Sequence, residues 1–239
     1  MLSKHREKQR LWVITECHYP EVTSSGHYLT KIAEGLTDTF DVKVICGQPS
    51  FLSRGTDSLI HGSPNGVEIF RVRGTNFDTG FAVKRTVNTI TRGVSMFWGS
   101  LRSFRKGDRV LVVTSPVHLP FTTAIASLVK GGSYTLLIKE LYPDRLVSLG
   151  KLKQNSIVVK AIHFANAWLF KHAARIIVVD PEIAKLISAY TGGLGVPIKI
   201  IPDWADSNEL LGISEPARKP AEFRYTLDVA LERYRNALR

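Results

Sequence analysis

The sequence has few cysteines and no long hydrophobic run, and each shortage excludes a class of protein. Its 239 residues include two cysteines, Cys17 and Cys46, which cannot build a zinc site alone or a disulfide framework, although one bridge between them remains open. This favours a reducing, cytoplasmic setting over secretion. No stretch reaches about 18 uncharged apolar residues, so we expect no membrane-spanning helix. The run LWVIT after the polar start is too short for a signal peptide.

Several motifs that carry chemistry are also missing. The sequence has no G-x-G-x-x-G, P-loop, C-x-x-C, H-E-x-x-H or G-x-S-x-G pattern. These absences argue against dinucleotide-binding enzymes, P-loop NTPases, zinc hydrolases and α/β-hydrolases. No two aspartates stand two positions apart, so the D-x-D pair that often holds a metal on a sugar nucleotide is missing. The sequence therefore predicts no metal and no resident cofactor.

Acidic residues are in the minority. The chain has 32 Lys and Arg against 21 Asp and Glu, a formal net charge of +11. Apolar residues make up 44% and charged residues 22%, which are globular proportions and exclude a mainly disordered, collagen-like or coiled-coil chain. The basic excess suggests an anionic partner, such as nucleic acid, lipid head groups or a phosphorylated ligand.

Short apolar runs alternate with longer helical patterns along the chain. Strands are expected at 11–15, 41–46, 67–72, 109–114, 134–139, 175–179 and 197–201, with helices between most of them. This alternation predicts an α/β fold, a single Rossmann-like domain whose mainly parallel sheet is flanked by helices. We expect that domain at 11–206, after a basic N-terminal extension (1–10) and before a linker and short C-terminal helix (207–239).

Two long helices carry apolar and basic residues together. From 83 to 104 the apolar residues step by 4 and 3, which predicts one stripe packed on the sheet. Cations lie mostly off that stripe and are either solvated or in contact with anionic lipid: Lys84, Arg85, Arg92, Arg102 and Arg105. The helix at 155–173 is rich in apolar residues all round and is expected in the core, although Trp168 and Lys171 could also anchor at a membrane interface.

Ligands of open α/β sheets bind at the carboxyl ends of the strands, so the loops there hold the candidate site residues. After the first strand, Ser24, Ser25 and Gly26 open a helix that could hold a phosphate or form a simple N-cap. After the strand ending at Thr114 come Ser115 and His118. The helix that follows them allows anion binding, and His118 is either a proton carrier or a plain loop histidine.

The segment 140–145, ELYPDR, is the most site-like stretch. It places Glu140, Tyr142, Asp144 and Arg145 beside a proline at the end of a predicted strand. A carboxylate here could orient or deprotonate a hydroxyl group. The alternative is a helix-capping turn with a surface ion pair.

The order of these pieces resembles the N-terminal domain of a glycosyltransferase family 4 enzyme, which has the GT-B fold. The resemblance covers nearly all of 11–206, and ELYPD followed by LG, together with IPDWAD (201–206), carries most of it. Such enzymes move a sugar from a nucleotide-sugar to an acceptor, often lipid-linked, in bacterial surface polysaccharide synthesis. They generally retain the anomeric configuration and need no metal.

The resemblance implies that this chain binds the acceptor. Ser25, Gly26, His118 and Glu140 would lie nearest the cleft between the two GT-B domains, and Glu140 and His118 would be the catalytic candidates. Supporting contacts would come from Ser24, Ser115, Tyr142 and Asp144. The chain departs from the family pattern where a glycine pair is usual, at Ser24-Ser25-Gly26, and where Gly or Ser is usual, at Asp180.

The larger departure is a missing second domain. That domain holds the nucleotide-sugar, typically through an E-x₇-E pair, and no two glutamates here are eight positions apart. We therefore expect the acceptor-binding half of a transferase, inactive alone, with a separate donor-binding polypeptide as a candidate partner. A truncated gene product, a basic membrane- or nucleic-acid-binding module, and a small α/β enzyme with another substrate stay open. The expected location is the cytoplasm, with peripheral contact at the inner face of the plasma membrane.

Overall fold

The computed structural model describes residues 8–16, 18, 24–48, 65–75, 82–192, 195–204 and 226–239. Cys17, residues 1–7 of the predicted extension, and the predicted linker up to residue 225 lie outside these residues, as do residues 49–64. Four predicted site residues lie in described helices, but their side chains are outside the description: Ser24, Ser25, Lys84 and Arg85.

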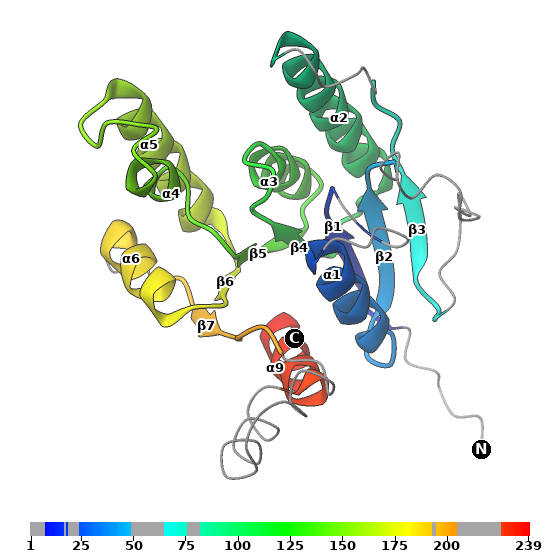
Figure 1. The fold of residues 1–239 in the computed structure, drawn as a ribbon. Coiled ribbons are helices and arrows are strands. Elements are labelled where there is room, and N and C mark those ends of the chain that lie inside the picture. Colours follow the sequence, from blue (N-terminus) through cyan, green and yellow to red (C-terminus); the bar gives the residue numbers. More distant parts are fainter. Residues whose placement is uncertain are drawn as a thin grey trace, which may run out of the picture. The chain divides into compact units, whose positions relative to one another are not determined.

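Seven strands form one sheet in the order β3-β2-β1-β4-β5-β6-β7. The strands are β1 (Arg10–Ile14), β2 (Asp41–Cys46), β3 (Glu68–Arg71), β4 (Arg109–Val113), β5 (Ser133–Ile138), β6 (Arg175–Val178) and β7 (Ile198–Ile200). Pairing is parallel between β1 and β2, β2 and β3, β5 and β6, and β6 and β7. Helices connect most successive strands (Figure 1), which confirms the predicted α/β class.

The chain packs as two compact units. Unit 1 comprises Met1–Leu111 with Ile125–Ser133, and unit 2 comprises Val112–Ala124 with Tyr134–Arg239. Helix α3 (Leu119–Val129) contributes residues to both. Each unit has its own buried residues and its own polar contacts.

Unit 1 contains β1, β2 and β3 with helices α1 (Ser24–Gly35) and α2 (Ala82–Ser103). The predicted apolar positions of α1 are all buried: Leu29, Ile32, Ala33 and Leu36. Trp12 on β1 packs against Phe70 and Phe104, with ring centroids 5.4 and 5.6 Å away. Its indole Nε1 donates to Asp108 Oδ2 at 2.9 Å, so the ring is held at both its apolar and its polar end.

The predicted apolar stripe of α2 is exposed over the N-terminal part that the structure describes and buried only toward its C-terminal end. Along the predicted stripe, Val87, Ile90 and Val94 are 37–59% exposed. Phe104, the last residue of the stripe, is buried just past the helix, and Phe97 and Leu101 are half-buried. The other buried positions, Asn88, Gly93, Met96 and Ser100, lie off the stripe. The periodicity identified the helix correctly, but the prediction that the whole apolar stripe packs on the sheet is wrong, because its described N-terminal part is exposed.

Unit 2 contains most of β5, β6 and β7 with α4 (Asp144–Ser148), α5 (Ile157–His172), α6 (Pro181–Thr191) and α9 (Leu227–Leu238). Helix α6 begins as its sequence predicts, because Asp180 Oδ1 accepts from Glu182 N at 2.7 Å and Pro181 occupies the first turn. Tyr134 on β5 donates to the carbonyl of Leu169 at 2.6 Å and ties α5 to the strand.

Helix α9 is an integral part of unit 2. It buries Ala230, Leu231, Tyr234, Ala237 and Leu238. Burial, followed by the charge of Asp203, raises the pKa of Tyr234 above its usual value. None of the helices in the described ranges combines the length and apolar composition that crossing a bilayer requires.

Candidate functional site

A narrow slot in unit 2 lies where strands β4 and β5 end. Its polar lining comes from Thr114, Glu140, Tyr142 and Asn166. Its apolar walls are formed by Val117, Pro120, Phe121, Ile138, Leu141, Leu169 and Phe170. The enclosed space is about 20 Å³, room for about one water molecule, so a sugar ring could contact the mouth of this slot but not enter it.

Glu140 presents its carboxylate at this slot with both oxygens oriented by neighbours. Tyr142 OH donates to Glu140 Oε2 at 3.1 Å, and Arg145 Nη2 lies 3.6 Å from Oε1. Burial, with the Glu140 contact next in importance, raises the pKa of Tyr142, so this phenol remains a donor at neutral pH. Glu140 itself is exposed, which leaves its carboxylate able to accept a further hydrogen bond.

Two of the polar lining residues were missed by sequence reasoning. Asn166 lies on α5, and its Nδ2 donates to the Tyr142 carbonyl at 2.6 Å. Thr114 Oγ1 donates to the Glu140 carbonyl at 3.3 Å. Both fix the backbone of the loop after β5. The only signal for Asn166 was an amide on the same face as Val159 and Phe170 in a helix rich in apolar residues.

Asp144 is tied to α6. Its Oδ1 accepts from Tyr190 OH, and its Oδ2 is buried without a hydrogen-bond partner in the part of the chain that the structure describes. Burial, and then the contact with Asp144, raises the pKa of Tyr190 to about 12. Asp144 is therefore positioned for a structural contact between α4 and α6 rather than at the slot.

Ser115 and His118 flank the slot without lining it. Ser115 is exposed and precedes Pro116 through a cis peptide bond, as Tyr142 precedes Pro143. The half-buried His118 comes just before α3, and its carbonyl accepts from Thr122 N at 3.2 Å. The slot thus gathers Glu140 and Tyr142 from the predicted set, and the roles of Ser115 and His118 stay predictions.

In unit 1, the predicted phosphate-binding segment forms the first turn of α1. Gly26 is buried, and its carbonyl accepts from Thr30 Oγ1 at 2.8 Å. The helix begins at Ser24, as the sequence predicts. Phosphate binding at Ser24, Ser25 and Gly26 stays a prediction.

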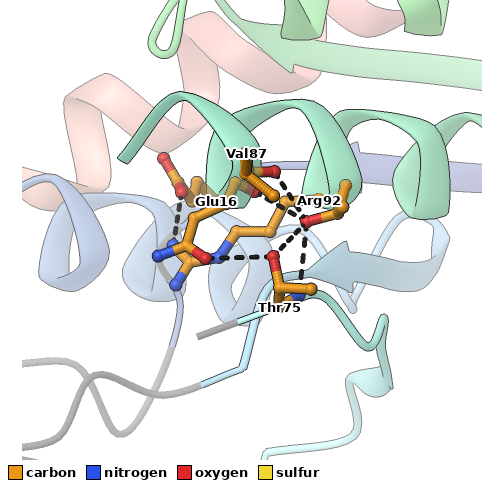
Figure 2. Close-up of polar contacts among 6 residues, drawn as sticks. Glu16, Thr75, Val87 and Arg92 are labelled. Carbon is orange, nitrogen blue, oxygen red and sulfur yellow. Dashed lines mark hydrogen bonds and ion pairs between the residues drawn. The ribbon is translucent and has the colours of Figure 1, made fainter. Parts of the chain in front are cut away.

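A second polar cluster of unit 1 joins the ends of β1 and β3 to α2 (Figure 2). Arg92 Nη1 donates to Glu16 Oε1 at 2.9 Å. Thr75 Oγ1 donates to Asn88 Oδ1 at 2.9 Å and lies 2.6 Å from Thr91 Oγ1. Arg92, predicted at a membrane surface, is therefore engaged by a carboxylate. Of the other four residues in that prediction, Arg102 and Arg105 are exposed.

His18 is buried near the same strand ends. Neither of its ring nitrogens has a hydrogen-bond partner among the described residues. Burial, and then the positive charge of Arg71, lowers the pKa of His18 to about 4. Arg71 Nη1 donates to the Gly47 carbonyl at 3.4 Å and lies 3.5 Å from Cys46 Sγ. His18 is thus neutral at physiological pH, a property that sequence reasoning did not predict.

The described residues contain no cluster of three or more His, Cys, Asp or Glu side chains arranged to hold a metal ion. The slot itself presents three hydrogen-bonding groups: one oriented carboxylate, one phenol and one guanidinium.

A search against protein-family models found no match. Among curated proteins, the chain is 26% identical over 109 residues to the Probable glycosyltransferase WbjE of Pseudomonas aeruginosa. The match covers 46% of this chain and 27% of that protein, so it spans about a quarter of its relative's length.

Two solved structures show how far the fold is shared. A sucrose-phosphate synthase structure from Thermosynechococcus elongatus has a TM-score of 0.53 and 9% identity, covering 91% of this chain and 97% of that one. The UGT2 of Phytolacca americana, solved with UDP-2-fluoro-glucose and pterostilbene, has a TM-score of 0.53 and 11% identity, covering 86% of this chain and 56% of that one. This chain therefore has the Rossmann-like α/β fold of GT-B glycosyltransferases.

Proposed function

We propose that this chain binds the acceptor in a sugar-transfer reaction, as the acceptor side of a GT-B glycosyltransferase of family 4. The observation that carries the proposal is the oriented Glu140 carboxylate at the carboxyl ends of β4 and β5, the edge at which α/β folds bind ligands. The similarity to a glycosyltransferase over 109 residues supports the same class of reaction.

Glu140 would bind a hydroxyl group of the acceptor. Tyr142 hydrogen-bonds to one oxygen of the Glu140 carboxylate and Arg145 pairs with the other, so the carboxylate is held in place with lone pairs that face solvent. A hydroxyl that donates to one of them is oriented, and its oxygen becomes a better nucleophile. His118 would be a second proton carrier on the neighbouring loop. Asn166 and Thr114 act through the backbone and are positioning residues.

The donor would be held elsewhere. A GT-B transferase brings donor and acceptor together across two domains, and this proximity supplies much of the rate. We propose that nucleotide-sugar binding requires a second domain, for which a separate polypeptide is one candidate. The 239 residues alone should then neither bind UDP- or GDP-sugars measurably in a calorimeter nor transfer sugar. Micromolar binding of either nucleotide-sugar would contradict this part of the proposal.

Acceptor binding can be tested with the full chain by ¹⁵N NMR, using hexyl β-glycosides of glucose, galactose, mannose and N-acetylglucosamine as probes. At least one glycoside should shift the amide signals of Thr114 and of residues 140–145. Glu140→Gln should weaken that binding about tenfold or more, because a hydrogen bond to a charged group is lost. Glu182→Gln is the matched control, since Glu182 is an exposed carboxylate on α6 paired with Lys185 at 2.8 Å.

Two results would refute the acceptor proposal. One is that no glycoside in the panel perturbs the slot residues. The other is that Glu140→Gln and Glu182→Gln bind equally well. Purification from the native host, with identification of the chains that co-purify, then tests for a donor-binding partner.

The acceptor proposal extends to a lipid-linked acceptor and to docking at the cytoplasmic leaflet in polysaccharide synthesis. The exposed part of the α2 stripe (Val87, Ile90 and Val94) supports membrane contact by this helix. So do Trp98 and the exposed cations Arg102 and, just after the helix, Arg105. Lys84, Arg85 and Arg92 belong to the same prediction. A non-catalytic basic module that binds anionic membrane or nucleic acid is the alternative. Retention on anionic vesicles but not on DNA columns would exclude nucleic acid as the partner.

A further inference from the structure

Helix α5 of unit 2 has one face buried in protein and one apolar face exposed. Val159, Leu169 and Phe170 are buried. On the other side, Ile157, Ala161, Phe164 and Trp168 are spaced by 4, 3 and 4 residues, so they form one stripe along the helix. Ile157 is 86% exposed and Phe164 is 80% exposed, and Trp168 is 36% exposed. This set of four residues is the α5 stripe, and it was expected to lie in the core.

An apolar groove extends the α5 stripe toward α3. It has a volume of about 410 Å³. Val117 and Phe121 line it from the start of α3, and Ile157, Val158, Ala161 and Ile162 line it from α5. Another side of α5 is covered by α6, where the rings of His163 and Tyr190 lie 4.7 Å apart. The groove and the α5 stripe together form an apolar surface larger than scattered exposed residues produce.

The charge of the segment that carries the α5 stripe has one sign. No Asp or Glu occurs in the sequence from Arg145 to Val179. Lys151, Lys153, Lys160 and Lys171 are exposed in the same segment. On a helical projection, Lys160 and Lys171 fall beside the α5 stripe, next to Phe164. The flanking carboxylates are engaged, because Asp144 accepts from Tyr190 and Asp180 caps α6.

We propose that α5 docks on an anionic lipid bilayer, with the α5 stripe inserted at the boundary between head groups and acyl chains. An apolar stripe bordered by lysines and free of carboxylates is the surface that such an interface binds, because apolar burial and attraction to anionic head groups act together. This proposal rests neither on the acceptor proposal nor on the α2 surface, so its failure would leave acceptor binding at Glu140 untouched.

The chain contains its own probes for the test. It has four tryptophans, and Trp12 and Trp204 are buried, which leaves Trp98 on α2 and Trp168 on α5 as the exposed ones. Trp98→Phe therefore isolates Trp168, and Trp168→Phe isolates Trp98. Each variant is mixed with phosphatidylcholine vesicles, with or without about a third phosphatidylglycerol, and with lipids brominated along the acyl chain. Quenching by bromine reports insertion of the remaining indole.

Trp168 emission should shift to the blue and be quenched on phosphatidylglycerol vesicles, and the effect should fall with added salt. Phe164→Ser should weaken partition of the protein onto these vesicles about tenfold, because the variant lacks the phenyl ring that would be buried among the acyl chains. Lys160→Gln should weaken it about fivefold. Val129→Ser, at an exposed apolar residue on α3 outside the α5 surface, is the matched control and should bind like the wild type.

Three outcomes would overturn the proposal: quenching confined to Trp98, equal binding to neutral and anionic vesicles, or a Phe164→Ser variant that binds like the wild type. Sedimentation without lipid tests a different occupant of the same surface. Self-association that Phe164→Ser abolishes would assign the α5 stripe to a second copy of the chain, and would also overturn lipid docking.

Discussion

Asp108 is the buried acid on which we make the most quantitative prediction. Its side chain is 4% exposed and meets three donors of unit 1: Arg10 Nη2 at 2.8 Å, Trp12 Nε1 at 2.9 Å and the backbone N of Arg105 at 2.9 Å. It thereby joins β1 to the turn that leads into β4. Asp108→Asn keeps the size of the side chain but removes the charge and turns one of the two oxygens into a donor.

The cost follows from these contacts. A hydrogen bond to a charged group contributes about 1.5–3 kcal/mol, and the asparagine can satisfy the donors on only one side of its amide. We expect Asp108→Asn to lower the free energy of unfolding by about 3–5 kcal/mol, which corresponds to a fall in Tm of about 10 °C for a chain of this size. Asp41→Asn is the control, because the Asp41 side chain is 48% exposed and its Oδ2 forms only a surface ion pair, 3.8 Å from Lys43 Nζ. It should cost less than about 1 kcal/mol.

Urea denaturation followed by far-UV circular dichroism measures both variants, and equal m-values would show that the same surface unfolds. A difference between Asp108→Asn and Asp41→Asn smaller than about 1 kcal/mol would refute the reasoning. Asp108 precedes β4, at the opposite end of that strand from Thr114, so glycoside binding by the folded Asp108→Asn protein should be unchanged.

Three further predictions concern other buried or crowded groups. The pKa of His18 is lowered from 6.5 to about 4, so as the pH falls the imidazole is protonated in the unfolded chain before it is protonated in the folded one. The free energy of unfolding should therefore be unaffected by His18 above pH 6.5 and should fall by up to about 3 kcal/mol toward pH 4. His18→Gln should remove this pH dependence, which urea titrations at several pH values measure. Gly74→Ala would place a Cβ 2.4 Å from Arg92 Cγ, so the Arg92 side chain would have to move. We expect this movement to lower the free energy of unfolding by about 1–3 kcal/mol. An unchanged Tm would show instead that the Arg92 side chain moves without cost. Asn166→Leu should lower the free energy of unfolding by about 1–2 kcal/mol and broaden the backbone amide NMR signal of Tyr142, because the hydrogen bond to the Tyr142 carbonyl is lost. A sharp, unshifted Tyr142 signal would refute the positioning role of Asn166.

The fold was predictable because most strands are short and almost entirely apolar. Segments such as DVKVIC and RIIVV have few other ways to bury β-branched residues, and both form strands where expected. The orientation of α2 was not predictable. Periodicity assigns residues to a common face, but it does not say whether that face meets protein, and the structure buries Asn88 and Ser100 while exposing Ile90.

The slot was predictable in part for a similar reason. The strand-end rule located Glu140 and Tyr142, because it depends only on where β5 stops. Asn166 comes from α5, 24 residues after Tyr142, and only the packing of α5 on the strand brings its amide to the loop. The burial of His18 likewise depends on neighbours that are distant in sequence, such as Arg71.

The place of α9 in unit 2 has a consequence for biosynthesis. Its buried residues include Tyr234 and Leu238. Its Asn236 carbonyl accepts from Arg175 Nη1 at 3.4 Å, from a residue 61 positions earlier in the chain. A nascent chain on the ribosome cannot close unit 2 until these residues have emerged. Until then, the surface that α9 covers is open to chaperones.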